Sequence, residues 1–257
     1  VRKDQLLRVA RRRPRRVEDV TSAVCFGMPS MAPEVWRRDV ARAKKRIRRG
    51  QVLVVSVVGT PGPGDGVDAL AEDFARCAGW AARAGADVVE ANYSCPNVCT
   101  PEGSVYQDPR TSRRLSEEIR AALPSTPFFI KAGHFETPAR LRAFYRAVDG
   151  LADAVVLVNG VSRRVVRADG QPVFGPFERV GILGRAIHAP AVENVRRAAR
   201  LSSSAGFRVE TIAVGGVMQE ADAGDFFAAG ASAVLLGGVP MLDPLLADRA
   251  KRQNPGW

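Results

Sequence analysis

Residues 87–97 read DVVEANYSCPN, a run rich in β-branched residues that ends in polar side chains and a thiol. Five more runs of the same kind occur at 52–58, 127–131, 154–159, 209–214 and 233–236. These runs are short and mostly apolar on both faces, which is typical of parallel strands that helices cover on both sides. The sequence therefore predicts six strands of a parallel sheet.

Helical patterns separate these runs along the chain. Between the first two runs, apolar residues recur at helical spacing at Leu70, Phe74, Cys77, Ala78 and Ala81. Further helices are predicted at 113–122, 138–147, 191–201 and 221–229. The alternation of strand and helix predicts an α/β fold in which crossover helices link parallel strands, as in a (β/α) barrel. In this pattern Cys77 is interpreted as core packing rather than as a reactive thiol.

The composition fits a single globular domain over residues 1–257, with 46% hydrophobic and 25% charged residues. No apolar run is long enough for a membrane helix, and the N-terminus lacks the pattern of a secretory signal, so a cytoplasmic protein is expected. The cysteines are too few for a disulfide framework and lack the spacing of a zinc site, so we expect reduced thiols and no metal. They are Cys25, Cys77, Cys95 and Cys99.

The formal net charge of +11 comes from the N-terminal segment. Residues 1–50 hold 16 of the 38 Lys and Arg but only 5 of the 27 Asp and Glu, so the rest of the chain carries 22 of each. Much of the excess falls on 33–49, where apolar residues such as Trp36 and Val40 keep helical spacing between basic ones. This segment predicts an amphipathic helix with a solvated basic face, and nucleic acid is not the expected partner.

The interval between the fourth and fifth runs is unusually long. Within it, the short apolar stretches 164–166 and 172–174 flank the turn sequence ADGQ at 168–171. This pattern predicts a small hairpin, inserted between residues 160 and 180, over the mouth of the barrel.

Glycine pairs follow the last two runs of the chain. Gly215-Gly216 comes directly after 209–214, and Gly237-Gly238 follows 233–236. In a parallel barrel, glycines at these strand ends let backbone N–H groups approach a phosphate. Two such pairs on consecutive strands indicate a phosphate-bearing cofactor.

The polar end of the 87–97 run resembles a family signature. Its residues Asn92 to Asn97 are similar to the Asn-x-Ser-Cys-Pro-Asn motif of dihydroorotate dehydrogenases, and the stretch 26–30 (FGMPS) resembles their Gly-Leu-Pro-Asn loop. Lys131 lies where that family carries a flavin-contacting lysine. The resemblance covers roughly residues 24–245 and implies a TIM-type (β/α)8 barrel of the dihydroorotate dehydrogenase type with FMN as cofactor. Only about six of its βα units are evident in this sequence.

The resemblance also implies roles in a flavin-dependent reaction at a CH–CH or C=C bond. Lys131 would place a cation beside the N1/O2 edge of the flavin, and Cys95 would act as general base or acid while hydride passes to or from flavin N5. Cys99 is a weaker candidate for the same base. The implied substrate-binding residues are Asn92, Asn97, Asn159 and Ser162. The implied cofactor-binding residues are Lys131, Asn159, Gly184, Gly215, Gly216, Gly237 and Gly238.

Two departures from the family pattern bear on substrate and assembly. Val24 and Cys25 stand where the family carries a substrate-binding asparagine, and Ser162 replaces another. A related cyclic amide from a specialised biosynthesis therefore competes with dihydroorotate from pyrimidine synthesis. Because strand-like sequence begins only at residue 52, the first two βα units are not evident. We expect the native gene product to extend upstream and the protein to form a homodimer.

Two other functions stay open at this stage. A dihydrouridine synthase is another flavin barrel, with an Asn-x-Gly-Cys-Pro motif, and here the basic helix would contact tRNA. Ser94 in place of the glycine argues against that reading. A non-catalytic barrel that serves as an assembly partner would be colourless when purified and would not take up FMN.

Overall fold

The computed structural model describes residues 6–10, 12, 14–25, 30–60, 62, 64–94, 104–177 and 179–256. The chain divides into two compact units. Unit 1 comprises residues 1–26, 157–200 and 211–257, and unit 2 comprises residues 27–156 and 201–210.

Unit 2 is built on parallel strands. They are β3 (Val54–Val57), β4 (Val88–Asn92), β5 (Phe128–Lys131) and β6 (Ala154–Leu157). Strand β4 pairs with β3 on one side and with β5 on the other, and β5 pairs with β6. The register sets Asn92 opposite Lys131, so β4 and β5 end at the same level. The first four predicted runs are thereby confirmed as neighbouring parallel strands.

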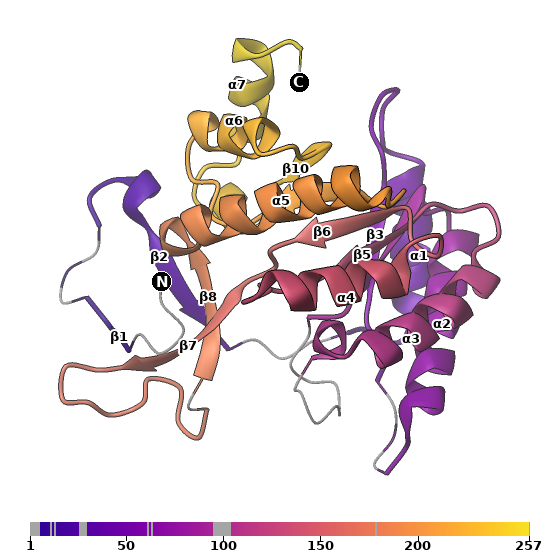
Figure 1. The fold of residues 1–257 in the computed structure, drawn as a ribbon. Helices are drawn as coiled ribbons and strands as arrows, with labels where there is room; N and C mark the ends of the chain where they lie inside the picture. Colours follow the sequence, from indigo (N-terminus) through magenta and orange to yellow (C-terminus); the bar gives the residue numbers. More distant parts are fainter. Residues whose placement is uncertain are drawn as a thin grey trace. The chain divides into compact units, whose positions relative to one another are not determined.

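Helices α2, α3 and α4 lie beside these strands, with α3 packed between α2 and α4 (Figure 1). The helices of unit 2 are α1 (Pro33–Lys44), α2 (Val67–Arg83), the 3-10 turn η2 (Val105–Gln107), α3 (Pro109–Ala122) and α4 (Pro138–Val148). Helix α3 begins four residues before the predicted start at 113. It does so because the Asp108 carboxylate accepts the backbone N–H groups of Arg110 and Thr111 and caps the first turn.

Unit 1 contains a separate four-stranded sheet in the order β1-β7-β8-β2 (Figure 1). Its strands are β1 (Leu7–Arg8), β2 (Thr21–Val24), β7 (Val161–Val166) and β8 (Arg179–Gly184), and the 3-10 turn η1 (Val17–Asp19) precedes β2. Strand β8 pairs antiparallel with both β7 and β2. The expectation that no strand precedes residue 52 is therefore wrong. Strands β1 and β2 are too short and polar to stand out locally, and their pairing with β7 and β8 makes them strands.

The remaining elements of the chain continue the α/β pattern. They are α5 (Arg185–Ala205), β9 (Glu210–Val214), α6 (Glu220–Ala228), β10 (Ala233–Leu235), the 3-10 turn η3 (Val239–Met241) and α7 (Leu246–Gln253). Strands β9 and β10 pair in parallel, and α6 contacts both β10 and α7. The last two predicted strands are thus confirmed. Helix α5 begins six residues before the predicted 191 and contains Pro190.

None of the helices in the described part of the chain combines the length and the apolar character needed to cross a bilayer.

Candidate functional site

Polar side chains gather at the carboxyl ends of the parallel strands of unit 2. Glu90 and Asn92 lie two residues apart on β4 and therefore point to the same face of the sheet. The register places Ser56 of β3 opposite Glu90 and Lys131 of β5 opposite Asn92, so all four side chains share that face. The residue between the two positions, Ala91, points to the opposite face.

Lys131 is held by an ion pair with Glu90. Its Nζ atom lies 2.6 Å from Glu90 Oε1, and the same carboxylate oxygen accepts the Ser56 hydroxyl at 2.7 Å. The Glu90 side chain is 4% exposed and that of Lys131 is 19% exposed. A cation that follows an apolar strand is thereby fixed at the strand end instead of extending into water.

Asn92 begins the turn that leaves β4. Its Oδ1 atom accepts both the backbone N–H and the hydroxyl of Ser94, at 3.2 and 3.0 Å. These two bonds occupy the lone pairs of the oxygen, so the amide N–H groups are what Asn92 can offer a ligand. The Tyr93 side chain points to the opposite face and packs edge to face on Phe74 of α2. Its hydroxyl forms a hydrogen bond with the Ser116 hydroxyl at 3.1 Å. Burial raises the pKa of the Tyr93 phenol, so this residue belongs to the core.

The rest of the signature lies outside the described residues. This part includes the predicted base Cys95, the predicted substrate residue Asn97 and the alternative base Cys99. Residues 26–29 of the upstream loop also lie outside the described residues.

Three of the predicted cofactor glycines of unit 1 have a steric reason to be glycine. Gly184, Gly215 and Gly216 have φ angles of +80°, +126° and +76°. A Cβ atom on Gly216 would lie 2.5 Å from the backbone N of His188, and one on Gly184 would meet the Val20 carbonyl oxygen. Only glycine tolerates this combination of positive φ and close backbone approach.

Gly237 and Gly238, which follow β10, have a different surrounding. Both are exposed, and a Cβ atom on either would meet nothing within 4 Å. Their backbone is therefore open to a ligand from solvent. This is the arrangement that an incoming phosphate needs, because backbone N–H groups can then reach its oxygens without a side chain between them.

Asp222 of α6 fixes the loop that carries Gly215 and Gly216. Its carboxylate accepts the backbone N–H groups of Met218 and Gln219 at 2.8 and 3.1 Å, and it pairs through both oxygens with the Arg185 guanidinium at 3.0 and 2.7 Å. Burial alone would raise the pKa of Asp222, but the hydrogen bonds from Arg185 and Met218 hold it below the usual range. The first turns of α5 and α6 are thus tied to the loop after β9.

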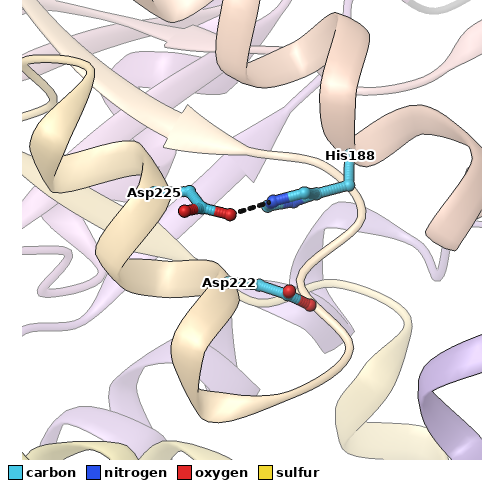
Figure 2. A group of neighbouring side chains, drawn as sticks. All are labelled: His188, Asp222 and Asp225. Carbon is cyan, nitrogen blue, oxygen red and sulfur yellow. Dashed lines mark hydrogen bonds and ion pairs between the residues drawn. The ribbon is translucent and has the colours of Figure 1, made fainter.

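His188 lies beside this network, and Figure 2 shows its ring directed at Asp225 with Asp222 below. His188 Nε2 lies 2.9 Å from Asp225 Oδ2, and the ring packs edge to face on Phe226. One ligand atom from each of His188, Asp222 and Asp225 falls within 4.8 Å of the others. Because the Asp222 oxygens already serve Arg185 and two backbone N–H groups, only two ligands are left, too few for a metal centre. The group supports the loop after β9.

The predicted substrate residues of unit 1 lie around the start of β7. Asn159 is half-buried in the turn before this strand. Ser162 is exposed on β7, opposite Gly181 of β8. The backbone carbonyl of Ser162 accepts Arg163 Nη1 at 2.7 Å and Arg179 Nη2 at 2.9 Å. Two guanidinium groups therefore converge on this strand end.

Sequence reasoning missed Glu90, Ser56, Arg185 and Asp222. A signal for Glu90 was present, because a carboxylate inside an apolar strand has to be paired when the strand is buried. No local signal identified Arg185 and Asp222 as partners, because 37 residues separate them.

The match to a known family is extensive. The profile of the family described as dihydroorotate dehydrogenase matches residues 8–253. The chain belongs to the dihydroorotate dehydrogenase family. A dihydroorotate dehydrogenase of Dictyostelium discoideum is 29% identical over 94% of this chain and 66% of its own length. The catalytic subunit of dihydroorotate dehydrogenase B (NAD(+)) of Fusobacterium nucleatum is 32% identical over 63% of this chain and 51% of its own length.

The fold agrees with this family membership. A crystal structure of the Eimeria tenella dihydroorotate dehydrogenase in complex with ferulenol superposes with a TM-score of 0.72 at 19% identity, over 88% of this chain and 65% of that one. The predicted dihydroorotate dehydrogenase-like barrel fold is thereby confirmed. The chain spans 66% and 51% of the lengths of the two curated relatives above. These matches do not favour the dihydrouridine synthase or the non-catalytic barrel.

Proposed function

We propose that this protein is an FMN-dependent oxidoreductase that oxidises the CH–CH bond of dihydroorotate or of a closely related cyclic amide. The observation that carries the proposal is the side-by-side placement of Asn92 and Lys131 at the carboxyl ends of β4 and β5, in a chain matched by the family profile over residues 8–253. Chemistry in parallel barrels is built at these strand ends.

The described residues fit FMN at two places. The open backbone of Gly237 and Gly238 suits a phosphate. The Lys131 ammonium suits the ring edge at which negative charge develops. The phosphate would be held by Gly184, Gly215, Gly216, Gly237 and Gly238, and the ring by Lys131 and Asn159. When bound, FMN would supply the hydride acceptor of the reaction.

The remaining residues of the proposal act on the substrate. Asn92, Asn97, Asn159 and Ser162 would hold a planar amide substrate, because carboxamides offer donors and acceptors in one plane. Cys95 would remove a proton from one substrate carbon while hydride leaves its neighbour. A thiol suits this task because its ordinary pKa of about 8.5 lies within reach of neutral pH.

Anaerobic reduction of the purified protein tests the proposal. We expect yellow protein, or protein that takes up FMN, whose flavin absorbance is bleached on mixing with L-dihydroorotate. 5,6-Dihydrouracil, which lacks the carboxylate, separates dihydroorotate from simpler cyclic amides and should bleach the flavin more slowly. Failure to bind FMN, or a bound flavin that neither compound reduces, would refute the proposed reaction.

We also propose that the protein acts as a homodimer in the cytoplasm. The proposal of a reducing compartment rests on the sequence, whose four cysteines are too few for a disulfide framework. Light scattering coupled to size-exclusion chromatography tests the assembly: a mass of 27.6 kDa would mark a monomer and refute the dimer.

A further inference from the structure

Glu90 is a buried carboxylate to which the proposed reaction gives no role. It is 3% exposed and receives both the Lys131 ammonium and the Ser56 hydroxyl on one oxygen. We infer that Glu90, oriented by Ser56, is the positioning residue that holds the Lys131 ammonium at the strand end and balances its charge beside a bound flavin. The part of this inference that concerns the flavin rests on the proposed function, while the part that concerns the ion pair does not.

The three residues come from three adjacent strands and share one face of the sheet, with Lys131 two residues beyond the position opposite Glu90. Ser56 of β3 lies opposite Glu90 of β4, and Lys131 follows on β5 with Nζ also 3.5 Å from Ser56 Oγ. A lysine has a flexible four-carbon stem with many rotamers, so a lysine at a strand end is poorly placed without an anchor. Glu90 supplies that anchor from within the sheet.

The burial of Glu90 makes the pairing obligatory. A carboxylate removed from water is stable only when a cation or hydrogen-bond donors compensate the lost hydration. The ammonium of Lys131 carries three N–H donors, of which one is directed to Glu90 at 2.6 Å and a second to Ser56 Oγ at 3.5 Å. The third can be directed to a ligand, while the pair as a whole stays neutral.

This neutrality has a consequence for a bound flavin. A lone ammonium next to the ring favours the negatively charged reduced state, and a neighbouring carboxylate counteracts that effect. Glu90→Gln keeps an oxygen acceptor of the same length for Ser56 and Lys131 but removes the negative charge. Reduction should therefore become easier in this variant.

The first measurement needs no flavin. Acetic anhydride labelling of the flavin-free protein, read at the Lys131 peptide by mass spectrometry, reports how firmly the amine is held in its ion pair with Glu90. Glu90→Gln should raise the labelling rate of Lys131 about fivefold, because the ion pair that restrains the amine is lost. Glu72→Gln, on the exposed surface of α2, is the matched control and should leave the rate at its wild-type value.

The second measurement uses the FMN-loaded protein. In Glu90→Gln the equilibrium for two-electron reduction should shift about tenfold towards the reduced state, a rise of about 30 mV in midpoint potential. Glu90→Asp keeps the charge but withdraws it by one methylene, so its potential should stay near wild type while FMN binds more weakly. A purely structural ion pair would leave the potential unchanged in both variants.

The outcomes separate the inference from the proposed function. If folded Glu90→Gln shows wild-type labelling of Lys131 and a wild-type potential, the inference is overturned and the proposed function stands. If the wild-type protein binds no FMN, the proposed function fails, and the labelling of Lys131 alone decides whether Glu90 positions it. Should Glu90→Gln not fold, Ser56→Ala removes only the hydroxyl, and unchanged labelling in that variant overturns the inference.

Discussion

Replacement of Asp222 by asparagine should destabilise the protein by about 3 kcal/mol. The Asp222 side chain is 4% exposed, and its carboxylate serves the Arg185 guanidinium and the backbone N–H groups of Met218 and Gln219. Removal of one partner from a buried ion pair typically has an effect of about 3–5 kcal/mol. The lower end applies because Arg185 is 32% exposed and asparagine keeps one of the two oxygens.

Thermal unfolding of the flavin-free protein measures this effect without the stabilisation that a bound ligand adds. For a chain of this size, 1 kcal/mol corresponds to about 2–4 °C in melting temperature, so Asp222→Asn should melt about 6–12 °C below wild type. Asp225→Asn is the control. The Asp225 side chain is 62% exposed and contacts His188, so its loss should change stability by less than about 1 kcal/mol.

The pH dependence identifies the carboxylate as the cause. The pKa of Asp222 in the folded protein lies below its value in the unfolded chain. The contribution of Asp222 to stability is therefore fully present above the unfolded pKa of about 4, and it is lost as the pH falls through the folded pKa. The difference between wild type and Asp222→Asn should therefore be constant from neutral pH to about pH 5 and shrink below about pH 4. At pH 7, a melting temperature of Asp222→Asn within 2 °C of wild type, about 1 kcal/mol or less, would refute the reasoning. A difference in stability between the two proteins that does not change with acidification would refute it as well.

Further predictions concern the thiols and the glycine corners. Cys95→Ala should retain FMN but slow the reduction of the flavin by L-dihydroorotate about 10²–10⁴-fold in stopped-flow experiments, and unchanged kinetics would place the base elsewhere. Gly216→Ala should weaken FMN binding and lower the melting temperature, because its Cβ would meet backbone atoms at positive φ. In the control variant Gly238→Ala the Cβ projects into open space, so this variant should melt like wild type. Burial, with a smaller effect from a nearby carboxylate, raises the pKa of the Cys77 thiol to about 11, so Cys77 should react with a disulfide reagent at pH 8 far more slowly than exposed Cys25.

The sequence by itself determined the elements that local pattern encodes. Each apolar run became a parallel strand, because a β-branched stretch bounded by turns has few other ways to bury both its faces. Local sequence also marked Lys131 as the end of a strand and Gly215-Gly216 as a glycine pair that follows one. The Asn92 motif identified the family before any contact was known.

The tertiary structure alone decided which partners these residues have. Glu90 meets Lys131 across 41 residues, and Arg185 meets Asp222 across 37. Strand β2 exists because it pairs with β8, about 160 residues further along the chain. Such pairings depend on strand register and on which buried charges face each other, and no local periodicity carries that information. Burial of the charged partners costs free energy, and their mutual attraction and hydrogen bonds offset that cost only once folding has brought them together.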